Sequence, residues 1–189
     1  MPREIAATCW WLAQGRVRGH MRGMTVPPAR TIALGSAVAA GAALVIAWAA
    51  QTWGELAPCE LCLWERWPYR AIVLLGLIAA VLPRGAARAL LLLMVLAALA
   101  GVALAAVHVG VELHFWPSPL PECAAPTFSG GSIADLLKAM PAHPAKPCDS
   151  PSFLIPGLPL SMAAMDLLYA ATFVMVLVGA LWMERGRRA

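Results

Sequence analysis

The chain has 189 residues, of which 61% are hydrophobic and 13% are charged. Average soluble domains carry about 45–50% apolar and about 25% charged residues, so the composition indicates a membrane protein of one domain, or two at most. The formal net charge of +4 comes from basic residues that cluster beside apolar segments. That clustering is typical of membrane topology and gives little support to a nucleic-acid-binding protein.

Four segments are long and apolar enough to cross a hydrocarbon core, which takes about 20 residues. They cover about 31–50, 61–82, 89–111 and 161–183. The chain is therefore predicted to be an all-α membrane protein, a four-transmembrane-helix bundle over 31–183. A basic segment over 1–30, without apolar periodicity, precedes the bundle, and a basic tail over 184–189 follows it.

Basic residues in the connections predict the orientation, because cytoplasmic segments carry an excess of Lys and Arg. Arginines concentrate in the N-terminal segment, in the connection 83–88 and in the tail, which share one side if the spans number four. Both termini are therefore expected in the cytoplasm, with outward loops over about 51–60 and 112–160. A cleaved signal peptide is the alternative for the first span, although that stretch is long for a signal, and the loop 51–60 would still face outward.

One part of the long outward loop has a helical pattern. Ser132 is placed to cap a helix whose apolar residues recur at i, i+3, i+4 and i+7, namely Ile133, Leu136, Leu137 and Met140. Beside a bilayer, such a stripe predicts either a helix lying on the membrane surface or a helix packed on the protein's own outer face.

A Cys-x-x-Cys motif, Cys59 and Cys62, lies at the start of the second span. Two thiols at this spacing can close into a disulfide, or one can become a thiolate with a depressed pKa. Cys62 falls at the first helical turn, where backbone N–H groups and the helix dipole favour an anion. Arg66 follows one turn later on the same face and is predicted to stabilise the Cys62 thiolate. The alternative for Arg66 is a snorkelling residue that anchors the helix end.

Two further cysteines, Cys123 and Cys148, lie in the outward loop, where disulfides persist, whereas Cys9 lies on the cytoplasmic side without a partner. A zinc site of four cysteines usually draws on two close pairs, which the separation of Cys123 from Cys148 does not provide. Two static staples are also disfavoured, because a Cys-x-x-Cys ring gains little chain entropy. The favoured interpretation is a reactive cysteine pair, Cys59 and Cys62, and a second pair, Cys123 and Cys148, carried by the loop. No metal site is expected.

With these motifs, the chain resembles the disulfide bond formation protein B (DsbB) family, the quinone-linked oxidases of bacterial inner membranes. The similarity rests on Cys-Glu-Leu-Cys-Leu-Trp-Glu-Arg at 59–66, on Trp-Pro-Ser-Pro at 116–119 before Cys123, and on Gly-Leu-Pro-Leu-Ser-Met at 157–162 after Cys148. With the four spans in the same order, it covers about 31–183.

The resemblance implies a catalytic relay of disulfides. A reduced periplasmic thioredoxin-like protein (DsbA-like) would attack a Cys123–Cys148 disulfide at Cys123, and the freed Cys148 would attack Cys59. Cys62 would then leave as a thiolate and pass electrons to a membrane quinone, either ubiquinone or menaquinone. An acceptor outside the thiol pool is required, because a strongly oxidising partner near −120 mV is reoxidised only by a higher potential.

The resemblance also implies residues beside the quinone. Arg66 matches the family's quinone-associated arginine, and Met162 aligns loosely with a family methionine near that site. His108 is a further candidate, because ionisable groups within spans tend to be functional, although the family's histidine falls at Gly110 when counted back from the loop cysteine. The alternative for His108 is a packing residue bonded to Glu112 or to a carbonyl.

Besides a zinc-binding membrane protein, which elemental analysis would reveal, two other functions stay open at this stage. One is an oxidase of the same shape that serves a private partner and a single client. The other is a non-catalytic membrane scaffold whose cysteines are structural. Neither nucleic-acid binding nor a resident flavin or haem is expected, because the chain has none of their sequence motifs.

Overall fold

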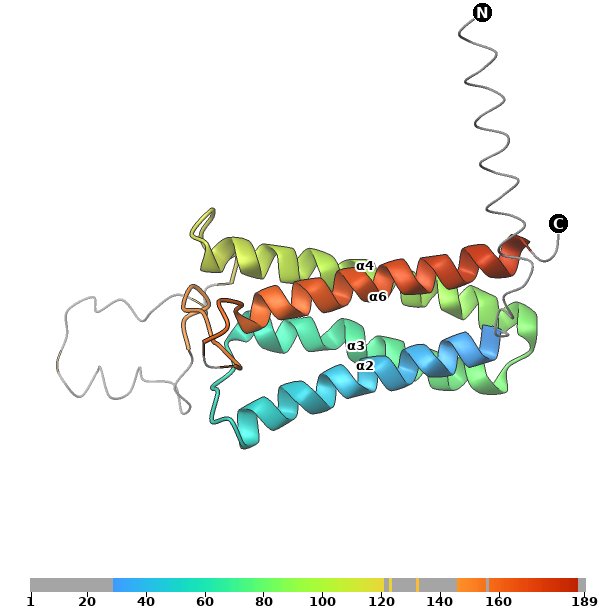
Figure 1. Ribbon diagram of the computed structural model, residues 1–189, viewed down its shortest axis with the longest axis horizontal. Helices are drawn as coiled ribbons and strands as arrows, with labels where there is room; N and C mark the ends of the chain where they lie inside the picture. The colour runs from blue at the N-terminus through green and yellow to red at the C-terminus, as the bar shows by residue number, and fades with distance from the viewer. Residues whose placement is uncertain (1–28, 121–122, 124–131, 133–145, 156, 187–189) are drawn as a thin grey trace, which may run out of the picture.

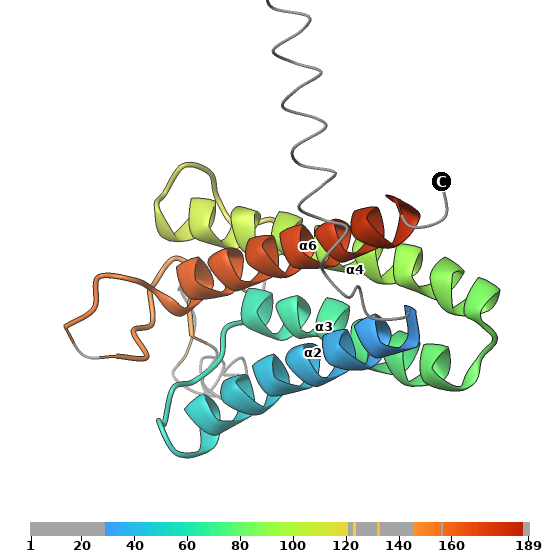
Figure 2. The ribbon, with the colours of Figure 1, turned by 45° about the vertical axis from the view of Figure 1, so that its right-hand side comes forward.

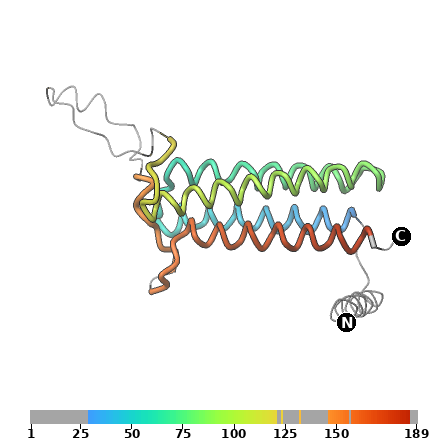
Figure 3. The backbone as a smooth tube through the Cα atoms, turned by 90° about the horizontal axis from the view of Figure 1, so that it is seen from above, coloured from blue at the N-terminus to red at the C-terminus, as the bar shows by residue number. Residues whose placement is uncertain are grey.

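The computed structural model describes residues 29–120, 123, 132, 146–155 and 157–186. Long helices dominate this part: α2 (Ala29–Thr52), α3 (Glu60–Val81), α4 (Arg84–Glu112) and α6 (Met162–Gly186). They lie side by side in an elongated bundle, as the three views agree (Figures 1, 2 and 3). We call the end where α2 ends, α3 begins, α4 ends and α6 begins the cysteine end.

The all-helical class is confirmed, and each described long helix overlaps one predicted span. Three of them, α2, α4 and α6, are long and apolar enough to cross a membrane. The fourth, α3, has 22 residues and lies among them, but Glu60, Glu65, Arg66 and Arg70 charge its first half. These charges gather at the cysteine end, whereas the second half of α3 is apolar.

The predicted connection 83–88 is shorter in the structure, because α4 already begins at Arg84. Pro83 occupies the N-cap position of this helix. Arg84 and Arg88 therefore belong to the first turns of α4, where long basic side chains can reach polar surroundings while their stems stay on apolar surface.

Small residues allow the helices to approach closely. A Cβ atom built on Gly76 of α3 would lie 2.7 Å from the carbonyl oxygen of Ala33 and 2.7 Å from the Cβ of Ala37, both on α2. Gly101 of α4 similarly lies against the ring of Pro68, which is buried inside α3. Such contacts between small residues are a common way for helices to associate in membranes, where packing replaces the hydrophobic driving force.

Away from the cysteine end the interior is apolar, and the bundle is closed by two polar contacts. Its largest fully buried side chains include Ile72, Leu91, Met94 and Leu177. Arg88 Nε donates to Glu184 Oε1 at 3.0 Å, which joins the start of α4 to the end of α6. Arg30 Nε donates to the carbonyl oxygen of Leu82 at 2.9 Å, which joins the start of α2 to the end of α3.

The predicted loop helix after Ser132 lies outside the described residues, as do Cys9, most of the basic N-terminal segment and the last three positions of the tail.

Candidate active site: two cysteine pairs and a cavity

The four predicted catalytic cysteines lie together at the cysteine end. Cys59, Cys123 and Cys148 form a buried cluster with Leu61 and Val111, and Cys62 packs against it. Residues far apart in the sequence are thus brought together by the end of α4 and the start of α3. The spatial proximity of the two pairs is what direct thiol–disulfide exchange requires.

Cys123 and Cys148 are joined by a disulfide, with their Cα atoms 5.0 Å apart. The backbone N–H of Cys148 also donates to the carbonyl oxygen of Cys123 at 3.4 Å. Both residues are deeply buried, with relative exposures of 3% for Cys123 and 1% for Cys148. This is the pairing that the family resemblance implies.

Cys59 and Cys62 are free thiols whose sulfur atoms lie 2.8 Å apart. Cys59 is the N-cap residue of α3, and its Sγ accepts a hydrogen bond from the backbone N–H of Cys62 at 3.3 Å. A side chain at the N-cap accepts from the first free amides of a helix. The backbone N–H of Cys62, one of the groups expected to favour an anion on Cys62, therefore serves the Cys59 sulfur instead.

This cap has an electrostatic consequence for Cys59, which lies just outside α3. Hydrogen bonds from the side chain and the backbone of Cys62 lower the pKa of the Cys59 thiol, and they outweigh the burial that raises it. A thiolate in the reduced pair is therefore favoured on Cys59. Only the thiolate form is nucleophilic, so the cap prepares Cys59 for exchange.

His108 contacts Cys59 rather than the loop or the lipid. Its Nε2 lies 3.4 Å from the Cys59 Sγ, and its Nδ1 lies 2.8 Å from the Glu65 Oε1. Both His108 and Glu65 are buried. A carboxylate on Nδ1 orients the ring, so that Nε2 can exchange a proton with the sulfur. The row Glu65–His108–Cys59 thus crosses from α3 to α4 and back.

The alternative of a packing histidine bonded to Glu112 or to a carbonyl is wrong, because the two ring nitrogens of His108 contact Glu65 and Cys59. Glu112 accepts a hydrogen bond from Ser161. Gly110, where the family's histidine would fall, has no room for a side chain. A Cβ there would lie 1.9 Å from the ring of Trp116, and Trp116 Nε1 donates to the carbonyl oxygen of Val107 at 3.1 Å.

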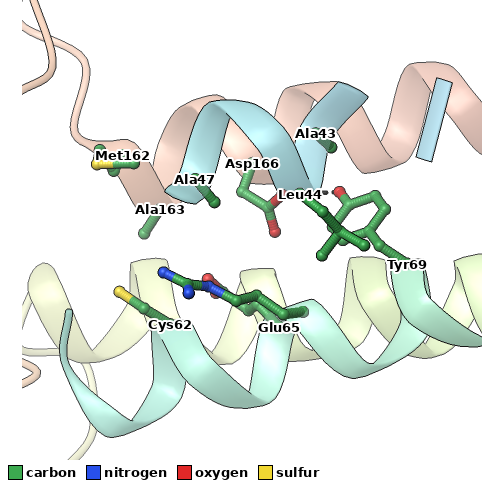
Figure 4. Close-up of a pocket in the computed structure, with 10 residues that line it drawn as sticks. Ala43, Leu44, Ala47, Cys62, Glu65, Tyr69, Met162, Ala163 and Asp166 are labelled. Carbon is green, nitrogen blue, oxygen red and sulfur yellow. Dashed lines mark hydrogen bonds between the residues drawn. The ribbon is translucent and has the colours of Figure 1, made fainter. Parts of the chain in front are cut away.

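A cavity of about 80 Å³ opens beside Cys62, between α2, α3 and α6 (Figure 4). Three of the predicted site residues, Cys62, Arg66 and Met162, line this cavity. The full lining is Ala43, Leu44, Ala47, Cys62, Glu65, Arg66, Tyr69, Met162, Ala163 and Asp166. His108 is not part of this lining, so the structure places it on the cysteine side of the site and not on the cavity side.

Arg66 is held by a neutral partner. Its NH1 donates to the Gln51 Oε1 at 2.6 Å, and among the described residues no carboxylate lies within ion-pair distance of its guanidinium. Glu65, its neighbour in sequence, points to His108 instead. The positive charge of Arg66 is therefore available to an anion in the cavity next to Cys62.

Gln51, Tyr69 and Asp166 were not identified from the sequence. Asp166 had a usable signal, because an acidic residue inside an apolar span is a functional candidate by default. Gln51 had none, since a polar residue at the end of a span commonly just meets the membrane interface.

Metal binding by all four cysteines is not supported, because Cys123 and Cys148 are consumed by their disulfide. The two free cysteines together with His108 could still ligate a metal, because the ligand atoms of Cys59, Cys62 and His108 lie within 4.8 Å of one another. This sulfur and imidazole set suits a soft ion such as zinc when the thiols are reduced.

These features define a class: an all-helical protein with helices of membrane-spanning length and two adjoining cysteine pairs, which is the make-up of a membrane thiol–disulfide oxidoreductase. The family model for disulfide bond formation protein DsbB matches residues 29–182, and the chain belongs to this family. The resemblance seen in the motifs is thereby confirmed. No curated protein and no solved structure matches the chain.

Proposed function

We propose that the protein reoxidises a periplasmic thioredoxin-like thiol oxidase (DsbA-like) and passes the electrons through its two cysteine pairs to a membrane quinone. The observation that carries this proposal is the joint position of the four cysteines and the Arg66 cavity. The buried Cys123–Cys148 disulfide shares one cluster with Cys59, while Cys62 faces the cavity. Membership of the DsbB family supports the same relay.

The proposed topology has four spans over about 31–183, with both termini cytoplasmic and the cysteine end in the periplasm. Its support is the distribution of arginines, because cytoplasmic ends of spans are enriched in them. Arg30, Arg84, Arg88 and Arg185 all belong to helix ends opposite the cysteines. Arg66 would then lie towards the outer interface, where a charged residue costs less than at the bilayer centre.

The first steps of the proposed relay are two exchanges. The partner's thiolate attacks the Cys123 Sγ, so the Cys123–Cys148 bond breaks and Cys148 leaves as a thiolate. Cys148 then attacks the Cys59 Sγ of an oxidised Cys59–Cys62 pair, and Cys62 leaves as a thiolate beside Arg66. The partner's second thiol then attacks the mixed disulfide between the partner and Cys123, so the partner leaves oxidised and Cys123 is released as a thiolate. Attack by Cys123 on the Cys148 sulfur of the Cys59–Cys148 bond restores the loop disulfide and releases Cys59 next to His108.

In the last step the Cys59–Cys62 bond forms again, and two electrons and two protons leave the pair. A quinone supplies an acceptor for both electrons and both protons. Arg66 stabilises the thiolate of Cys62 and negative charge that develops on an acceptor oxygen. His108, oriented by Glu65, accepts the proton of Cys59 when this residue becomes the nucleophile.

The cavity residues fit a quinone ring. A single water needs about 10–15 Å³ of such space, so a cavity of about 80 Å³ has room comparable to a substituted six-membered ring. Most of its lining is apolar, and its few polar side chains come from α3 and α6. Mostly apolar walls with a few placed polar groups are typical of small-molecule sites.

An anaerobic titration tests the proposal. The purified, fully reduced protein is mixed with ubiquinone or menaquinone, and quinone loss and thiol loss are followed together. We expect one quinone reduced for each dithiol oxidised, and no reaction in the Cys62→Ser variant. Thiols that persist beside unreacted quinone would favour the scaffold alternative. Reoxidation of only one of several thioredoxin-like proteins would favour the private-partner alternative.

A further inference from the structure

Asp166 is an acidic residue inside the apolar helix α6, and the relay described above does not use it. Its Oδ1 accepts a hydrogen bond from the Tyr69 hydroxyl at 2.7 Å. Its Oδ2 is buried, and within the described residues no donor lies within hydrogen-bond distance of it. Asp166 is the only aspartate in α2, α3, α4 and α6.

The position of Asp166 links it to the cavity beside Cys62. Asp166 extends from α6 towards α3, and it lines the same cavity as Glu65 and Cys62 (Figure 4). An ionised carboxylate with an unpartnered oxygen is costly to bury, and costlier still within a membrane. A neutral carboxylic acid avoids that cost, and it presents an O–H that can be donated to a molecule in the cavity.

The chemistry of the proposed reaction needs such a group. When two thiols become a disulfide they release two protons, and a quinone that accepts the two electrons must also gain two protons. Among the cavity residues, Glu65 already holds His108, Arg66 does not release its proton, and Tyr69 is occupied with Asp166. Asp166 is the remaining acid with an uncommitted oxygen.

We propose that Asp166 is the proton donor to a quinone oxygen, with Tyr69 holding its carboxyl group in place. This inference rests on the proposed function. A proton leaves Asp166 Oδ2 for a quinone oxygen, and the acid regains a proton released by the Cys59–Cys62 thiols. The same transfer to the second quinone oxygen delivers the second thiol proton. Glu65 lies between the two ends of this path, because it binds His108 at the Cys59 side and lines the cavity at the Asp166 side. The net reaction is quinone plus dithiol giving quinol plus disulfide.

The first test compares Asp166→Asn with Glu184→Gln. The second variant is a control that neutralises a carboxylate at the opposite end of the bundle. Asn keeps the shape and a hydrogen-bond donor but cannot release a proton. We expect the single-turnover rate of quinone reduction to fall by about 10²-fold, the lower range for general acid catalysis, with the quinone KM nearly unchanged. Glu184→Gln should reduce quinone at the wild-type rate.

A second readout needs no variant. Infrared difference spectra of the reduced protein, recorded with and without ubiquinone, should show a protonated carboxyl band that moves when ¹³C-labelled aspartate is incorporated. Absence of an aspartate band, or a wild-type rate in a folded Asp166→Asn protein, overturns the role of Asp166. Failure of the wild-type protein to reduce quinone at all would instead overturn the proposed function.

Discussion

Cys59 and Cys62 are three positions apart, yet their sulfur atoms have different surroundings. The Cys59 Sγ accepts a hydrogen bond from the backbone N–H of Cys62 and contacts His108 Nε2. Cys62 faces the cavity that contains Arg66. The pair is therefore asymmetric: the Cys59 sulfur lies with the loop disulfide and His108, and the Cys62 sulfur faces the cavity that we propose for the electron acceptor.

The lowered pKa of Cys59 predicts how its reactivity depends on pH. In the reduced protein, alkylation of Cys59 by iodoacetamide should have its midpoint below the ordinary thiol pKa, because Cys62 donates hydrogen bonds to the thiolate. In Cys62→Ala the side-chain donor is lost, so the midpoint should move to higher pH. Mass spectrometry of the alkylated peptide measures both midpoints.

The Cys62→Ser variant is the matched control for this titration, because its hydroxyl still donates. It should keep much of the lowered midpoint. Equal midpoints in Cys62→Ala and Cys62→Ser would show that the side chain at position 62 does not act on Cys59.

Arg66 has a prediction of its own. Arg66→Met should raise the quinone KM by about 10- to 100-fold, the equivalent of losing a charged hydrogen bond of about 1.5–3 kcal/mol. Exchange between the cysteine pairs should continue, which quenched-thiol assays can follow. The control is Arg70→Met: Arg70 is exposed and stacks on Trp67 at 5.2 Å, away from the cavity. A KM unchanged in Arg66→Met would contradict its role.

At the scale of single residues, part of the candidate site was predictable from the separation of residues in the sequence. Cys62 and Arg66 share a helical face by their separation, and that prediction needs no tertiary information. Asp166, Gln51 and the His108–Glu65 contact depend on how α2, α4 and α6 are rotated about their own axes. Helices that are apolar all round carry little information on that rotation, so the contacts of these residues could not be predicted, although Asp166 could have been named as a candidate from its charge alone.

At the scale of elements, the contact between α2 and α3 depends on Gly76. A Cβ there would lie 2.7 Å from a backbone oxygen of α2, and backbone cannot move aside as a side chain can. Gly76→Ala should therefore destabilise the protein by about 1–3 kcal/mol, the usual cost of overpacking. Unfolding in mixed detergent measures the difference.

Gly35 in α2 supplies the control, because a Cβ there would meet nothing within 4 Å. Gly35→Ala should leave stability unchanged or raise it by up to about 1 kcal/mol through helix propensity. If both alanine variants behaved alike, the close approach at Gly76 would not contribute to stability.

The helices themselves were largely predictable, since about 20 consecutive apolar residues leave few structural choices. The residues at which the helices begin and end were less predictable. Arg84 looked like part of a connection because it is charged, but Pro83 fixes the helix start immediately before it. The span predicted for α3 was the least clear, because charged residues crowd its start, and this charged first half contributes Cys62, Glu65, Arg66 and Tyr69 to the cavity lining.

At the scale of the whole molecule, the proposed orientation predicts which end meets the periplasm. A cysteine introduced at Phe115, an exposed position at the cysteine end, should react with a membrane-impermeant maleimide added to spheroplasts. A cysteine at Gly85, exposed at the opposite end, should react only after the membrane is permeabilised. The reverse pattern would place the cysteine pairs in the cytoplasm and exclude a periplasmic partner.

The burial of Cys123 and Cys148 has a consequence for which molecules can donate electrons to the protein. Because these two residues are so little exposed, access to their sulfur atoms depends on the size and shape of the reductant: a small dithiol needs less space than a folded protein. Steric access, more than redox driving force, would then decide which thiols can reduce this disulfide.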